Sequence, residues 1–177
     1  MNPDLSYPLG RFEMPKSVDV AMRSGHVAAI ESTPRSLRDA IAGLDARQLD
    51  TPYRPGGWTV RQVVHHLPDS HMNAYVRFRL ALTEDAPTIR PYDESLWARL
   101  PDAKTGDVEM SLKLLEAVHA RWLACIRALP AEVFDRTYRH PEMGVVSLDQ
   151  QLALYAWHGR HHVAHITALA RRSGWRS

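Results

Sequence analysis

The sequence predicts an all-α protein, an antiparallel four-helix bundle with short extra helices and a small loop or hairpin before the last helix. Two observations carry this prediction. Four long segments repeat apolar residues at three- and four-residue steps, and the connections between these segments are of modest length. Such helices bury their apolar faces against one another. We expect a single domain over residues 1–177, since no repeat, low-complexity tract or long linker divides the chain.

The composition is that of one globular domain. Of 177 residues, 45% are hydrophobic and 24% are charged, which argues against a disordered, collagenous or membrane-spanning chain. The 22 Lys and Arg against 20 Asp and Glu give a net charge of +2, so no strong field favours nucleic acid or an anionic membrane as partner. The single cysteine, Cys125, excludes an internal disulfide, and the N-terminal residues lack a signal-peptide pattern; we therefore expect a cytoplasmic protein.

The first half of the chain is predicted to form an arm and two long helices. Residues 1–16 contain three prolines and a glycine and indicate an extended arm that lies on the body. The first helix spans about 17–45, with a bend or break expected near Pro34. The second, over about 59–83, begins at a capping-box pattern, Thr followed three residues later by Gln, and contains Pro68, which is expected to kink it.

The second half is predicted to add two more long helices. Residues 93–100 form a short helix, and a third long helix spans about 107–128. After Pro130 comes a short helical turn, and in 134–148 alternating residues around a proline and a glycine suggest a small hairpin or ordered loop. A second capping-box pattern then opens the fourth long helix, over about 147–172.

Histidine is the one unusual count, with ten residues. Six of them lie in two short segments, on the predicted second and fourth helices: His65, His66, His158, His161, His162 and His165. At about 100° per residue, His158 and His162 lie about 40° apart on one face of the fourth helix. The apolar stripe of that helix runs past His162, which therefore points at or near the bundle interior, whereas His161 falls on the other side of His158.

This histidine pattern is typical of a metal site. Two histidines at i and i+4 can bind the same ion, and His65 or His66 can supply a third ligand, leaving positions open for water or substrate as in catalytic sites. Gly159 stands where zinc metalloproteases carry a glutamate base, which excludes that class. The alternatives are an internal polar network, a histidine-rich surface patch, or a site on His161 and His165, which have the same spacing.

Four stretches of the sequence also resemble a known family. They are LSYPLGRF (5–12), the block from TPYRPGGWTV to WARLPD (51–102), ALPAEVFDRTYRHPEMG (128–144) and LALYAWHGRHHVAHI (152–166). These stretches resemble the YfiT-type branch of the DinB-like superfamily. Together they span nearly the whole chain, and the long central block is distinctive.

The resemblance implies a four-helix bundle, usually a homodimer, that binds one divalent metal ion per subunit, zinc or nickel, through three histidines. Matched position by position, the second histidine of VVHH becomes His66, and the pair in WHxxxH becomes His158 and His162. This choice agrees with the helix geometry. His65 points about 100° away from His66 and is expected to support the site rather than to bind the ion.

Two activities follow from the resemblance. YfiT-type proteins are described as metal-dependent hydrolases, and related proteins are transferases that join a low-molecular-weight thiol, such as bacillithiol, to an electrophile. In both cases the metal lowers the pKa of the nucleophile, water or thiol, which then attacks a small-molecule substrate. The alternative from another class is a bundle that binds metal without catalysis, for example in a stress response.

Two further residues are candidates for catalysis. Asp69 lies three residues after His66 and can reach the metal region as a hydrogen-bond acceptor or proton relay, with a surface or capping role at Pro68 as the alternative. Tyr155 precedes His158 by three residues and can present its hydroxyl to a substrate, although an aromatic residue on this stripe is also typical of a core.

Overall fold

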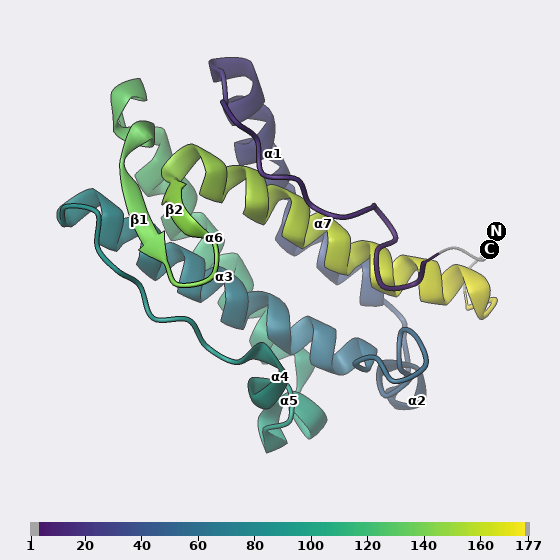
Figure 1. The fold of residues 1–177 in the computed structure, drawn as a ribbon. Helices are drawn as coiled ribbons and strands as arrows, with labels where there is room; N and C mark the ends of the chain where they lie inside the picture. The colour runs from purple at the N-terminus through teal and green to yellow at the C-terminus, as the bar shows by residue number, and fades with distance from the viewer. Residues whose placement is uncertain (1–3, 176–177) are drawn as a thin grey trace.

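The computed structural model describes residues 4–175; residues 1–3 and 176–177 of the predicted domain lie outside this range. Four long helices, α1 (Val20–Ile41), α3 (Val60–Thr83), α6 (Val108–Arg127) and α7 (Leu148–Arg172), pack as a bundle (Figure 1). The predicted all-α four-helix bundle is confirmed. The shorter elements lie in the connections: α2 (Ala46–Leu49), α4 (Glu94–Trp97), α5 (Pro101–Thr105), the 3₁₀ helix η1 (Ala131–Asp135), β1 (Thr137–His140) and β2 (Gly144–Ser147).

The helix ends follow their capping residues. Thr59 caps α3 and Ser147 caps α7, and each forms the predicted capping box with the glutamine three residues later. The first helix is shorter than the predicted 17–45, because Asp19 caps its start and α2 begins separately after its end. The expected break near Pro34 does not occur, since α1 continues through this residue.

The predicted hairpin before the last helix is confirmed. Strands β1 and β2 pair antiparallel, with Thr137 opposite Ser147 and His140 opposite Gly144. Gly144 has a φ of 74°, which a glycine adopts without the steric cost that a Cβ would bring. The short helix predicted within 93–100 is α4, whereas α5 was not expected from the sequence.

The relative directions of the helices follow from the residues that meet. Helix α1 runs parallel to α7, since Arg23 pairs with Asp149 near their starts and Thr33 approaches Gly159 further along. Helix α1 runs antiparallel to α6, where the side chain of Arg38 bonds Glu109 near the start of α6.

The other two pairs of adjacent helices are likewise one parallel and one antiparallel. Helices α3 and α6 run parallel, with His65 bonded to Ser111 near their starts and the Phe78 ring 5.7 Å from that of Trp122 near their ends. Helices α3 and α7 are antiparallel. The predicted antiparallel packing thus holds for two adjacent pairs, and the other two run parallel because the connection over residues 84–107 carries the chain back along the bundle.

The apolar core consists of two clusters with polar residues between them. One cluster contains Phe78, Trp122 and Leu152, and the other contains Leu115 and Ile166 among its buried members. On α3, α6 and α7 four buried histidines have residue numbers between those of the two clusters: His71, His119, His158 and His162. His66 on α3 lies beside Leu67 of the second cluster. Within residues 4–175, no helix is long and apolar enough to cross a membrane.

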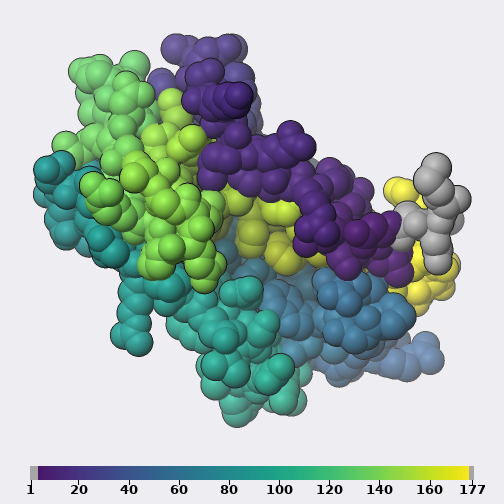
Figure 2. All heavy atoms as spheres, viewed as in Figure 1, coloured from purple at the N-terminus to yellow at the C-terminus, as the bar shows by residue number. Residues whose placement is uncertain are grey.

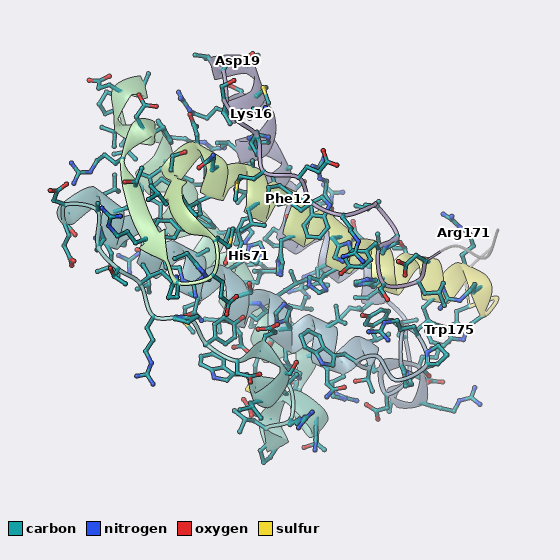
Figure 3. The ribbon with its side chains drawn as sticks, in the orientation of Figure 1. Phe12, Lys16, Asp19, His71, Arg171 and Trp175 are labelled. Atoms are coloured by element: carbon teal, nitrogen blue, oxygen red, sulfur yellow. The ribbon has the colours of Figure 1, made fainter. Side chains whose placement is uncertain are left out.

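The N-terminal arm lies along α7, as the purple segment in Figures 1 and 2 shows. The Phe12 ring, labelled in Figure 3, is 5.6 Å from that of Trp157, and the side chain of Gln150 donates to the carbonyl of Pro15. The arm therefore covers one side of α7, while α3 covers another.

Candidate metal centre

Three imidazoles converge where α3 passes α7. His66 lies on α3, and His158 and His162 lie one turn apart on α7. One ring nitrogen of each comes within 4.8 Å of those of the other two. The Nε2 atoms of His66 and His158 are 3.2 Å apart. We call these three residues the tripod.

The tripod fits a metal ion on its own geometry. Two ligand nitrogens at about 2.0–2.1 Å from a tetrahedral zinc ion lie about 3.3 Å apart, close to the separation of the His66 and His158 Nε2 atoms. Burial lowers the pKa of His66 to about 4 and holds those of His158 and His162 well below the ordinary value. All three are therefore neutral near pH 7, and neutral imidazole is the form that binds metal.

Two more buried histidines continue from the tripod into the bundle. His71 Nε2 lies 3.2 Å from His158 Nδ1, and His119 Nε2 lies 2.8 Å from His71 Nδ1. His119 Nδ1 in turn lies 2.8 Å from the carbonyl oxygen of Ile30 on α1. Figure 3 labels His71 among the side chains that fill the bundle interior.

A cavity of about 810 Å³ opens onto the tripod. Figure 2 shows the corresponding hollow between the N-terminal arm, the blue residues before α3 and the teal α4 region, with atoms of α7 in its depth. The Trp58 ring lies 4.7 Å from that of His66. Such a volume lies within the range of pockets that enclose small-molecule ligands.

A buried cation also lines this cavity. Arg77 on α3 is only 9% exposed; its guanidinium donates to the Arg90 carbonyl at 3.5 Å and lies close to Tyr155. Among residues 4–175, no carboxylate forms an ion pair with Arg77. The Tyr155 ring lies 5.6 Å from the His158 ring, and burial raises the pKa of Tyr155, which keeps its hydroxyl protonated. An unpaired buried charge beside the tripod is costly unless a ligand compensates it.

The structure separates the two catalytic candidates. Tyr155 lines the cavity beside the tripod. Asp69 is half-buried and does not line the cavity; burial, with a smaller contribution from Asp102, raises its pKa to about 6. His65 also lies apart from the tripod, because its Nδ1 bonds Ser111 Oγ at 2.7 Å and its Nε2 faces the carbonyl of Gly106.

The second histidine pair on α7 has different surroundings. His161 is 5% exposed, although the sequence placed it away from the apolar stripe, because Tyr7 of the arm lies over it at 5.9 Å between ring centroids. His165 Nε2 donates to the carbonyl of Ser6, and its ring stacks on Tyr53 at 4.0 Å. Both histidines border the cavity, but neither belongs to the tripod.

The sequence interpretation missed His71, His119 and Arg77. A signal for the two histidines was present, because each occupies a buried position of its helix in register with Leu67 or Leu115, four residues earlier. Arg77 gave no such signal, since arginine in a helix is most often solvated.

A sequence model of the DinB superfamily matches residues 29–166. The chain belongs to the DinB superfamily. Among its relatives, this DinB protein is 49% identical over 173 residues to YfiT of Bacillus subtilis, with 97% of each chain covered. It is 52% identical over 172 residues to a protein of Bacillus cereus. The aligned region covers 97% of this chain and 99% of the relative. Both relatives carry the name "putative metal-dependent hydrolase".

Two solved structures resemble this DinB protein. The structure of Bacillus subtilis YfiT, described as having an unusual four-helix bundle topology, matches with a TM-score of 0.94 at 49% identity, covering 97% of this chain and 99% of that one. The four-helix bundle protein TT2238 matches with a TM-score of 0.58 at 20% identity over 82% of this chain and 98% of its own, which shows the fold alone.

Proposed function

We propose that this DinB protein is a metal-dependent hydrolase, in which His66, His158 and His162 bind one divalent ion beside a small-molecule cavity. The observation that carries the proposal is the convergence of three neutral imidazoles from two helices on one point of the cavity wall. The names of the relatives support hydrolysis as the reaction.

The donor set suits zinc or nickel. Imidazole nitrogen is a common ligand of both ions, and three protein ligands leave coordination positions open. An ion bound there would lower the pKa of a water molecule and supply hydroxide near neutral pH.

The residues around the tripod have separate tasks in this proposal. Arg77 holds a negatively charged oxygen of the substrate or of the transition state, because it is a buried cation without a carboxylate partner among residues 4–175. Tyr155, which lies close to Arg77 and is kept protonated by burial, donates a hydrogen bond to the same oxygen. Trp58 covers the His66 ring and excludes bulk water from that side.

Hydrolysis of p-nitrophenyl acetate tests the proposal. Protein stripped with a chelator should lose turnover and regain it with one equivalent of zinc or nickel, and His158→Ala should remain inactive with either ion. His65→Ala is the matched control, because His65 is a buried histidine outside the tripod. Turnover that survives stripping, or that persists in all three tripod variants, would contradict the proposal, because the reaction would then not depend on the tripod. A zinc- or nickel-loaded wild type without turnover would also contradict it and leave a bundle that binds metal without catalysis.

Thiol transfer is the second candidate, because the cavity is large enough for a thiol and an electrophile together. Conjugation of bacillithiol to monochlorobimane by the zinc-loaded protein measures this reaction. Conjugation without ester hydrolysis would replace the hydrolase with a transferase, whereas hydrolysis without conjugation would exclude transfer to this thiol.

A further inference from the structure

A proline on α1 frees a backbone acceptor in the bundle interior. In an α-helix the carbonyl of residue i accepts from the N–H of residue i+4, so the carbonyl of Ile30 would accept from residue 34. Residue 34 is Pro34, which has no N–H. His119 Nδ1 lies 2.8 Å from the freed oxygen and takes the place of the missing donor.

This contact fixes the proton positions of three imidazoles in turn. A carbonyl oxygen only accepts, so His119 Nδ1 carries the proton, and a neutral imidazole then has an acceptor at Nε2. The partner of that acceptor is His71 Nδ1, which must donate. His71 Nε2 is then an acceptor, and His158 Nδ1 must donate to it. His158 Nε2 is left with its lone pair directed at the tripod.

We propose that Pro34, His119 and His71 are positioning residues, which hold His158 as its Nδ1–H tautomer with its Nε2 lone pair ready to bind metal. This inference rests on the proposed metal site. Each of the four long helices supplies one step: the Ile30 carbonyl on α1, His119 on α6, His71 on α3 and His158 on α7.

The chain of contacts orients the ligand and does not conduct protons. It ends at an amide carbonyl, which has no proton to release and cannot pass one on. Metal-binding histidines usually direct their second nitrogen at a carboxylate, a carbonyl or water, and such partners fix the ring and its tautomer. Here a carbonyl has that role from a distance, through two intervening imidazoles.

Nitrogen-15 NMR of the metal-free protein tests the tautomers without metal or substrate. At a pH where all histidines are neutral, the ring protons of His119, His71 and His158 should each be found on Nδ1. A wild-type His158 protonated mainly on Nε2 would overturn the proposal, whatever the activity of the protein. Since this readout needs no metal, its failure is distinct from failure of the proposed hydrolase.

Pro34→Ala is the most specific variant, because it returns an N–H that competes for the Ile30 carbonyl and leaves every histidine in the sequence unchanged. We expect a second tautomer of His119 and His158 in the NMR spectrum and zinc binding weakened about tenfold, measured by competition with a chromophoric chelator. Arg35→Ala, a change of an exposed side chain on the same turn, is the control and should leave both unchanged. An unchanged tautomer and a zinc affinity within about twofold in Pro34→Ala would contradict the proposal.

His119→Phe removes the imidazole that joins the Ile30 carbonyl to His71, while it keeps an aromatic ring in the core. It leaves His71 Nδ1 without its acceptor, and zinc binding should weaken about 10- to 100-fold. His65→Phe, a matched substitution of a buried histidine outside the chain of contacts, should bind zinc as the wild type does. Equal losses in the two variants would show a general packing effect and overturn the assignment.

Discussion

Helix α7 carries two histidine pairs with the same four-residue spacing, and their surroundings differ. The inner pair, His158 and His162, faces α3, where His66 completes the tripod. The outer pair, His161 and His165, faces the N-terminal arm and Tyr53, which offer rings and a carbonyl instead of a third imidazole.

His158 differs from the other three histidines of the two pairs in the contact of its Nδ1 atom. His158 Nδ1 contacts His71 and so joins the chain of contacts that ends at Ile30. His165 Nε2 donates to the Ser6 carbonyl, and the Nδ1 atoms of His161, His162 and His165 are buried without a hydrogen-bond partner among residues 4–175. The four-residue spacing on α7 thus permits a metal site at either pair. The residues of the facing elements determine which pair has a third imidazole beside it.

Removing a tripod ligand should have the largest effect. His158→Ala should weaken zinc binding by about 1,000-fold or more, roughly 4 kcal/mol, because two imidazoles remain. His161→Ala, on the outer pair, should bind zinc within about threefold of the wild type. Chelator competition on both variants checks this, and the reverse ranking would assign the metal to the outer pair.

Substitution of Arg77, which lines the cavity beside the inner pair, tests the residues around the tripod. Arg77→Met keeps much of the side-chain volume and removes the charge, so we expect kcat/KM for the hydrolysed ester to fall about 100-fold with metal content unchanged. Arg99→Met is a matched change at an exposed arginine of the cavity rim and should have a small effect. Equal losses in the two variants would remove Arg77 from the mechanism.

Gly159 follows His158 on α7, faces Thr33 and sets how closely α7 approaches α1. A Cβ built there would lie 2.6 Å from Thr33 Oγ1, so Gly159→Ala should destabilise the metal-free protein by about 1–3 kcal/mol despite the better helix propensity of alanine. At Gly25 an added Cβ would meet open space, so Gly25→Ala should stabilise the metal-free protein by about 0.5–1 kcal/mol. Urea unfolding compares the two, and adding Thr33→Ala should recover part of the loss.

Asp69 gives the smallest expected effect, because it lies outside the cavity of the inner pair. Its folded-state pKa of about 6 exceeds its ordinary value of 3.8, so the folded state binds the proton more tightly. Its contribution to stability is therefore present at low pH and is lost as pH rises from about 4 to 6. At pH 7, Asp69→Asn should be more stable than wild type by less than about 1 kcal/mol, since Asp69 is partly solvated.

The same pair of unfolding curves at pH 4 is the control for Asp69. There the carboxyl is protonated in the folded wild type, so the advantage of Asp69→Asn should shrink. An advantage that is equal at both pH values would show that the carboxylate charge is not its cause.

The sequence predicted what depends on neighbours along the chain. The capping boxes of α3 and α7, the hairpin before α7 and the inward face of His158 and His162 all follow from residues within a few positions of one another. Patterns of this kind indicate which face of a helix is buried.

Patterns of neighbouring residues do not indicate which other element covers the buried face of a helix. The burial of His161 depends on the arm some 150 residues earlier, and the parallel direction of α3 and α6 depends on the long connection between them. The contact of His119 with the Ile30 carbonyl joins two helices and needs a proline on one of them. Tertiary contacts of this type have no local signature.

The most direct test of the central claim is a crystal structure of the zinc-loaded protein with anomalous diffraction measured at the zinc edge. We predict one strong peak, about 2.0–2.1 Å from a ring nitrogen of each of His66, His158 and His162, with His71 against the other nitrogen of His158. A peak on His161 and His165, or crystals of the loaded protein without a peak on the tripod, would contradict the account.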